Sequence, residues 1–223
     1  MKVKICGITN LDDALKAIDC GADMLGFNFY PQSRRYIFPQ DCSKIVSTLQ
    51  RYRSDITLVG VFVNASVKQI RRILISCNLD LAQLSGDETP ETLQDLDGKA
   101  FKGLRPKDQD TLIQLIDKYP GRPVPPAYLI DAYHPGLYGG TGETAKWSLA
   151  AWLSTHTPLL LAGGLTSDNV GRAVHQVQPW GVDVASGVEG SPGCKDEQKM
   201  RAFITAAKST ADVPMRNERS VDL

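Results

Sequence analysis

Apolar and polar positions alternate along the chain with two different periods. Eight short runs of mostly β-branched and aliphatic residues have the length of strands, and helical patterns separate them. The predicted strands cover residues 3–6, 24–27, 57–63, 79–84, 100–104, 127–131, 158–162 and 182–186. Residues 12–20 form an amphipathic stretch that Gly21 ends, and residues 66–76 repeat apolar side chains at helical spacing. This alternation predicts a parallel sheet covered by helices.

Eight strand and helix units in roughly 205 residues favour a single (β/α)8 TIM barrel, an α/β fold that usually takes about 250 residues. An open doubly wound sheet is the alternative, but no GxGxxG motif follows the first strand. No linker divides the chain, so we expect the barrel to occupy residues 1–208. Residues 209–223 are polar and mixed in charge, which predicts a frayed tail.

The charge balance narrows the class of partner. Of the 223 residues, 25 are Lys or Arg and 25 are Asp or Glu, so the formal net charge is zero. A neutral chain has no general attraction for phosphate backbones or anionic membranes, and we expect neither nucleic acid nor a membrane as partner. A small neutral or anionic ligand fits better.

Cysteine and histidine usage points to a reduced, metal-free protein. The five cysteines are odd in number and dispersed, and they form no CxxC pair. The three histidines do not pair at strand ends, so no metal site is expected. The chain starts directly with a strand pattern, and we expect a cytoplasmic protein without signal peptide or anchor.

In a TIM barrel, catalytic residues follow the carboxyl ends of strands. Cys6 ends the first predicted strand and precedes Gly7, so its thiolate could accept a proton at the barrel mouth. Because a free thiol has a pKa of ~8.5, this role needs a nearby cation or other help. The alternative is a small core residue. Lys4 shares the inward face, and we predict a buried structural pair with Asp183.

Asp131 ends the sixth predicted strand and precedes a glycine-rich loop. Its carboxyl could act as a general acid if burial raises its pKa. Equally, a carboxylate at this position could cap the following segment. The loop contains Gly140, Thr141 and Gly142, which either allow a ligand to approach the backbone or form a tight turn.

Small residues also follow the seventh and eighth predicted strands, at Gly163, Gly164, Ser186 and Gly187. TIM barrels commonly bind phosphate between these two loops through backbone N–H groups. The matched positions predict a phosphate site.

Two segments present arginines. Arg34 and Arg35 lie in the loop after the second strand with no obvious acidic partner, and Arg105 ends the fifth strand. Arginine binds a planar carboxylate through paired hydrogen bonds, so these residues fit an acidic substrate. The alternative is an exposed, solubilising turn.

Several segments together resemble phosphoribosylanthranilate isomerases. They are KICGIT at 4–9, GFNFYPQSRR at 26–35, VGVFVN at 59–64, GGTG at 139–142, LAGGL at 161–165, GVDVASGVE at 181–189 and PGCKD at 192–196. The resemblance runs from the first strand to the last helix and leaves out only the tail.

The resemblance implies a cofactor-free Amadori rearrangement in tryptophan biosynthesis, with a small phosphoribosyl compound as substrate. For the assembly we expect a monomer or a homodimer. By this likeness Asp131 is the general acid and Cys6 the general base. Arg35 matches the arginine that faces the anthranilate carboxylate in the family. The residues of the phosphate-binding loops are Gly163, Gly164, Ser186 and Gly187.

The chain also departs from the family pattern. Ser85 stands where the family usually has histidine, Arg34 replaces a proline, and Lys146 replaces an aspartate. A serine can donate a hydrogen bond but carries no charge. Two other functions stay open: a related phosphosugar isomerase, which typically uses aspartates at strands one and five, and a catalytically silent barrel that binds a phosphorylated metabolite.

Overall fold

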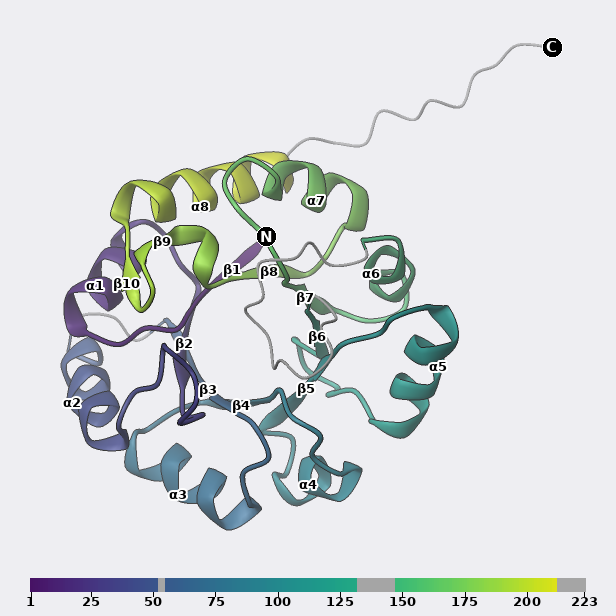
Figure 1. Cartoon of the computed structure of the whole chain (residues 1–223), viewed down its shortest axis with the longest axis horizontal. Coiled ribbons are helices and arrows are strands. Elements are labelled where there is room, and N and C mark those ends of the chain that lie inside the picture. Colours follow the sequence, from purple (N-terminus) through teal and green to yellow (C-terminus); the bar gives the residue numbers. More distant parts are fainter. Residues whose placement is uncertain (52–54, 132–146, 212–223) are drawn as a thin grey trace, which may run out of the picture.

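The computed structural model describes residues 1–51, 55–131 and 147–211. Parallel strands follow one another around a closed barrel in chain order, and β1 pairs with β8 to complete it (Figure 1). The strands are β1 (Lys2–Cys6), β2 (Met24–Asn28), β3 (Thr57–Phe62), β4 (Leu81–Leu84), β5 (Ala100–Leu104), β6 (Tyr128–Ile130), β7 (Leu159–Leu161) and β8 (Gly181–Val184). The predicted barrel is therefore confirmed, and the open doubly wound sheet is wrong.

The helices surround the barrel as an outer layer (Figure 1). Three of them begin at a polar residue, Asn10, Ser66 or Asp108, whose side chain accepts a hydrogen bond from a first-turn N–H. The helices are α1 (Leu11–Asp19), α2 (Pro39–Leu49), α3 (Val67–Ser76), α4 (Pro90–Asp95), α5 (Gln109–Lys118), α6 (Trp147–Ser154), α7 (Val170–Val177) and α8 (Glu197–Ala211).

The boundaries differ from the predicted ones mainly at strand ends. Strand β6 stops at Ile130, so Asp131 lies just beyond it, and β8 stops at Val184, before the glycine segment. Helix α8 continues through Ala211, so residues 209–211 belong to the last helix and not to the predicted tail. Residues 212–223 lie outside the described part of the chain.

The core has two parts. A large cluster fills the layer between the strands and the helices, and a smaller one fills the barrel interior. The interior cluster contains Met24, Val59, Phe101, Leu129, Leu160 and Ala162. Lys4, Gln83 and Asp183 are also buried. Because Lys4 and Asp183 come from paired positions on β1 and β8, a polar layer is built into the barrel.

A short segment between β8 and α8 adds an element that the pattern did not predict. It consists of the 3-10 helix η1 (Ser186–Val188) and an antiparallel pair, β9 (Glu189–Ser191) and β10 (Cys194–Lys195). Figure 1 shows this hairpin beside α1 and α8. Thr9 Oγ1 donates to Gly193 O at 2.7 Å, which fixes the hairpin turn to the segment after β1.

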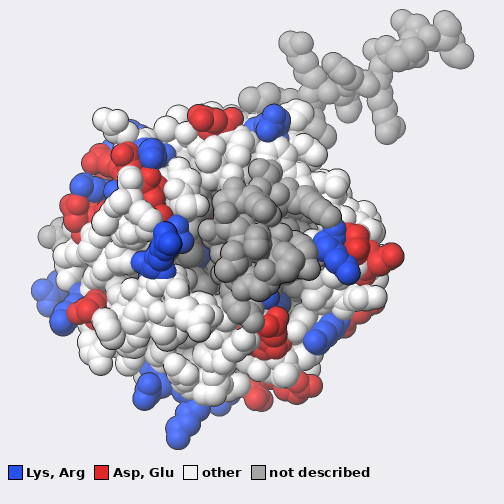
Figure 2. Space-filling model, in the orientation of Figure 1, with Lys and Arg blue, Asp and Glu red and all other residues white. Residues whose placement is uncertain are grey.

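The surface fits the neutral composition. In Figure 2, acidic and basic side chains are interspersed over the face in view, without a large area of one sign. Within the part of the chain that the structure covers, every helix is too short or too polar to span a membrane.

Candidate active site

Cys6 lies at the carboxyl end of β1 and is buried. Its neighbour on β2 is Gly26, and a Cβ atom there would lie 2.8 Å from Cys6 Sγ and 3.0 Å from Lys4 Nζ. The missing side chain of Gly26 therefore makes room for the thiol and the ammonium side by side. A larger residue at this position would displace one of them.

Lys4 pairs with Asp183, as the sequence predicted. Its Nζ donates to Asp183 Oδ1 at 2.7 Å and to Gln83 Oε1 at 3.0 Å. Gln83 Nε2 in turn donates to Ser85 Oγ at 3.0 Å. A continuous polar chain thus crosses the barrel from β8 through β1 to the end of β4.

These contacts set the protonation of both groups. Burial raises the pKa of the Cys6 thiol, the charge of Lys4 lowers it, and the net shift is upward. Burial alone would lower the pKa of Lys4, but the charge of Asp183 raises it above its ordinary value. Lys4 therefore stays an ammonium ion, and it favours the thiolate form of Cys6.

The loops after β7 and β8 line one cavity together with Asp131. Gly163 and Gly164 both have positive φ angles, +93° and +64°, which glycine adopts without strain. A Cβ atom on Gly187 would overlap the Leu165 carbonyl oxygen, so the two loops approach each other closely. Small residues are needed here for the loops to meet around a ligand.

The Gly163–Gly164 turn is held from the helix side. Asn169 Nδ2 donates to Gly164 O at 2.9 Å, and Asn169 Oδ1 accepts from Thr166 N at 2.9 Å. Ser186 begins η1 on the opposite side of the same cavity. Two backbone turns and the start of a short helix meet here, an arrangement that can bind an anion through N–H groups.

Asp131 follows β6 and lines this cavity beside the glycine loops and Asp183. Its backbone N–H donates to Leu104 O at 3.0 Å, so the residue continues the strand ladder by one step. Cys6 is not among the residues that line this cavity. The link between them is Asp183, which lines the cavity and binds the Lys4 ammonium next to the thiol.

Arg35 has an acidic partner, so the expectation from the sequence that it has none is wrong. Its Nε and Nη2 donate to the two carboxylate oxygens of Glu189, each at 2.7 Å. The pairing joins the loop after β2 to Glu189, the first residue of the β9–β10 hairpin. The two residues are far apart in sequence, and the sequence pattern did not predict the hairpin. For this reason the sequence pattern did not show the pair.

Comparison with known proteins decides the family. Residues 3–206 match the family described as N-(5'phosphoribosyl)anthranilate (PRA) isomerase. An N-(5'-phosphoribosyl)anthranilate isomerase of Geobacter sulfurreducens is 45% identical over 208 residues, which is 93% of this chain and 98% of the relative. One from Roseiflexus sp. is 46% identical over 95% of this chain and 99% of its own.

The chain belongs to the phosphoribosylanthranilate isomerase family.

Solved structures of the family support this assignment. The phosphoribosyl anthranilate isomerase of Thermotoga maritima superposes with a TM-score of 0.83 at 35% identity, covering 94% of this chain and 99% of that one. Another family structure, in complex with reduced 1-(o-carboxyphenylamino)-1-deoxyribulose 5-phosphate, has a TM-score of 0.80 at 34% identity and the same coverage.

The sequence also indicated Ser85, Arg105 and residues of the loop after β6 as candidates. Ser85 follows β4 and belongs to the polar chain from Lys4. Arg105 Nη2 donates to Gly86 O at 3.4 Å and to Asp87 Oδ1 at 3.3 Å. Gly140, Thr141, Gly142 and Lys146 lie outside the described residues.

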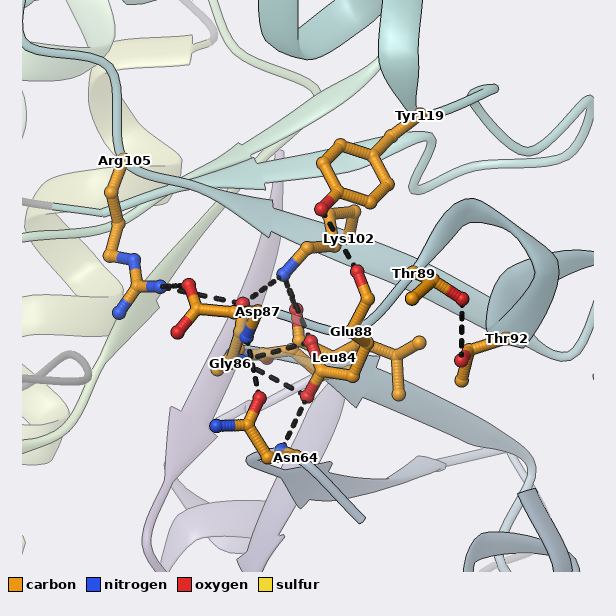
Figure 3. A network of polar contacts seen from close by, with 12 residues as sticks. Asn64, Leu84, Gly86, Asp87, Glu88, Thr89, Thr92, Lys102, Arg105 and Tyr119 are labelled. Atoms are coloured by element: carbon orange, nitrogen blue, oxygen red, sulfur yellow. Dashed lines mark hydrogen bonds and ion pairs between the residues drawn. The ribbon is translucent and has the colours of Figure 1, made fainter. Parts of the chain in front are cut away.

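A buried ion pair that the sequence pattern did not predict holds the loop after β4 (Figure 3). Lys102 Nζ donates to Glu88 Oε2 at 3.0 Å and to Gly86 O at 2.6 Å. Glu88 accepts from the backbone N–H groups of Gly86 and Asn64. The network therefore fixes the segment that presents Ser85. A lysine in the otherwise apolar fifth strand was the available signal.

All five thiols are free, and the other four cysteines lie outside the eight barrel strands. Cys42 on α2 and Cys77 after α3 are both buried, and Cys77 Sγ donates to Pro39 O, the first residue of α2, at 3.3 Å. The sequence did not show this contact. Within residues 1–51, 55–131 and 147–211, no cluster of three or more His, Cys, Asp or Glu residues could hold a metal ion.

Proposed function

We propose that the chain isomerises N-(5-phosphoribosyl)anthranilate to its carboxyphenylamino-deoxyribulose phosphate in tryptophan biosynthesis, with Asp131 as acid and Cys6 as base. The observation that carries this proposal is the arrangement of strand ends in a member of this family. An anion-binding pair of loops follows β7 and β8, a carboxyl group follows β6 in the same cavity, and a thiol beside an ammonium ends β1.

The reaction begins with opening of the ribose ring. Asp131 gives its proton to the ring oxygen, the bond from this oxygen to C1 breaks, and the nitrogen lone pair forms an iminium ion at C1. Cys6 then removes the proton from C2, and the electron pair of this bond moves to give an enolamine.

Tautomerisation completes the reaction, because protonation at C1 and loss of the hydroxyl proton at C2 yield the ketone. Carbon 2 is oxidised and carbon 1 is reduced within one molecule, so the electrons balance without a co-reactant.

Lys4 supports the second step through Cys6, without contacting the substrate. The thiol of Cys6 has a raised pKa in its buried position, and the neighbouring ammonium offsets part of this increase. Removal of a proton from C2 needs the thiolate, so the charge of Lys4 lowers the free energy of the reactive form. Lys4 acts through Cys6 and is a positioning residue.

The two anionic ends of the substrate have separate partners. We assign the phosphate to the loops that contain Gly163, Gly164, Ser186 and Gly187, which line one cavity. We assign the anthranilate carboxylate to Arg35, which lies in the loop after β2 and packs against Gly7. The reacting carbons lie between these anchors, next to the ends of β1 and β6.

The alternatives receive no support from the structure or from the relatives. A phosphosugar isomerase with two aspartates would need one at each of the first and fifth strand ends, where this chain has Cys6 and Arg105. A silent barrel would not need the thiol and ammonium pair above Gly26. Monomer or homodimer assembly and a cytoplasmic location stay predictions, although a relative from Thermotoga maritima is described as dimeric.

The test is turnover of the substrate, prepared from anthranilate and 5-phosphoribosyl diphosphate by a transferase. Anthranilate compounds fluoresce, so conversion changes the signal with time. We expect continuous conversion that scales with the concentration of the purified chain. Saturable binding with no conversion would contradict the isomerase proposal and would favour the silent barrel.

A further inference from the structure

The strongest unassigned feature of the mouth is the group of charges that surrounds Glu189. The carboxylate is buried, at 5% side-chain exposure, and lies between two cations. Arg35 Nε donates to Oε1 and Arg35 Nη2 to Oε2, while Lys195 Nζ donates to Oε1 at 2.9 Å. No role for Glu189 or Lys195 follows from the reaction steps, yet Glu189 contacts the proposed carboxylate-binding residue Arg35, and Lys195 contacts Glu189.

The way Glu189 binds Arg35 leaves one edge of the guanidinium available. A guanidinium group carries five N–H donors in a fixed plane. Glu189 takes the edge formed by Nε and Nη2. The edge formed by Nη1 and Nη2 has no hydrogen-bond acceptor within the described residues, and a second carboxylate fits this edge in the same paired geometry.

Arg35 is also fixed along its stem. Gly7 has a φ of +79°, and a Cβ atom there would lie 2.5 Å from Arg35 Cδ. The arginine stem therefore lies directly on the turn that follows Cys6. With Gly7 against the stem and Glu189 on one edge, the guanidinium has a single orientation beside the end of β1.

The carboxylate of Glu189 is itself anchored by the chain around it. Lys195 Nζ also donates to Ala185 O at 3.0 Å, and the Lys195 backbone N–H donates to Asp13 Oδ2 at 2.9 Å. Lys199 Nζ donates to Glu189 O at 2.8 Å. The hairpin, α1 and α8 thus hold Glu189 in place.

The charges of this group favour an incoming anion. Two cations, Arg35 and Lys195, contact one carboxylate, so the three side chains together carry one positive charge. An arginine paired with glutamate alone would be neutral and would attract a second carboxylate weakly. Lys195 offsets the charge of Glu189 and leaves that of Arg35 for a ligand.

We propose that Glu189, supported by Lys195, is a positioning and specificity residue that aims the free edge of Arg35 at the carboxylate of the substrate. The inference rests on the proposed isomerase function and deepens it. It makes Glu189 responsible for preference for an anthranilate over an aniline ring, although Glu189 carries the same charge as the group it helps to bind.

The test compares two substrates in the full chain. One is N-(5-phosphoribosyl)anthranilate, and the other is N-(5-phosphoribosyl)aniline, which lacks only the carboxylate. For Glu189→Gln we expect KM for the anthranilate substrate to rise on the order of tenfold, because Arg35 loses the charge-assisted contact with Glu189 that orients it. We expect kcat to change less than about threefold and the kinetics with the aniline substrate to stay unchanged.

Three further variants make the result specific. Glu189→Asp keeps the charge on a shorter side chain and should restore part of the affinity. Arg35→Lys should lose the same preference, and combining it with Glu189→Gln should add little. Glu197→Gln, an exposed residue on α8 that follows the hairpin, is the matched control and should behave as wild type.

An equal change with both substrates, or a loss of kcat alone, would show that Glu189 only supports the fold and would overturn the inference. So would additive effects of Arg35→Lys and Glu189→Gln. Absence of turnover by the wild-type chain with either substrate is a different result, because it contradicts the isomerase function itself.

Discussion

At the scale of single residues, the thiol of Cys6 is controlled by what lies next to it. The space above Gly26 brings the Lys4 ammonium beside it, and Asp183 holds that ammonium in place. Burial and Asp183 raise the pKa of the thiol, whereas Lys4 lowers it. The net upward shift means that the thiol form dominates at neutral pH, and the rate then depends on the small thiolate fraction.

This arrangement predicts the pH dependence of turnover. Because the base must be deprotonated and its pKa is raised, kcat/KM should increase with pH beyond the ordinary thiol value of ~8.5. In Lys4→Met the increase should move to still higher pH, since the charge that lowers the pKa is gone. The rate of alkylation of Cys6, followed by peptide mass spectrometry, should show the same shift. A rate that levels off below neutral pH would contradict Cys6 as the base.

At the scale of elements, the strand pattern and its order could be predicted from the sequence, because buried parallel strands are continuous apolar runs. The positions of Asp131 and the two glycine loops, directly after strand ends, also predicted that they lie together, and they line one cavity. The β9–β10 hairpin could not be predicted, since its strands span only 189–191 and 194–195 and have no periodicity. The ion pair of Arg35 and Glu189 could not be predicted either, because Glu189 belongs to this hairpin and only the tertiary structure brings it to Arg35.

The buried pair of Lys102 and Glu88 gives a prediction for the loop after β4. Both side chains are almost fully buried, at 3% and 1% exposure. Lys102→Met leaves the Glu88 carboxylate without its cation and should lower the free energy of unfolding by about 3–5 kcal/mol. Urea unfolding followed by circular dichroism measures this change.

The double variant Lys102→Met with Glu88→Gln is the matched comparison. It removes both charges, and it should recover a large part of the lost free energy of unfolding. If the single and double variants are equally unstable, the loss comes from packing and not from an unpaired charge.

At the scale of the whole molecule, ion pairs join the two ends of the described chain. Asp23 contacts Lys2 on β1 and Lys208 on α8, and Glu189 contacts Arg35 and Lys195. Burial alone would raise the pKa of each carboxyl, but the partners lower it below its ordinary value. These ion pairs join the segments next to β1, the strand that ends at Cys6, to α8 and to the β9–β10 hairpin.

Lowered carboxyl pKa values predict the response to acid. Each group binds protons more weakly in the folded state than in the unfolded one, so its contribution is complete above the unfolded pKa of about 4. The contribution is lost as pH falls through the lower folded pKa. Thermal unfolding should therefore give a steady Tm between about pH 6 and 8 and a decrease below about pH 4. An unchanged Tm in acid would contradict this.

The central claim is that Cys6 and Asp131 transfer the protons, and the most direct measurement is kcat of Cys6→Ala and Asp131→Asn with N-(5-phosphoribosyl)anthranilate. Each variant should lose at least ~10²-fold in kcat while Tm changes little. Cys20→Ala and Asp19→Asn, on or next to α1, should keep wild-type kcat. Near-normal turnover by either Cys6→Ala or Asp131→Asn would contradict the account.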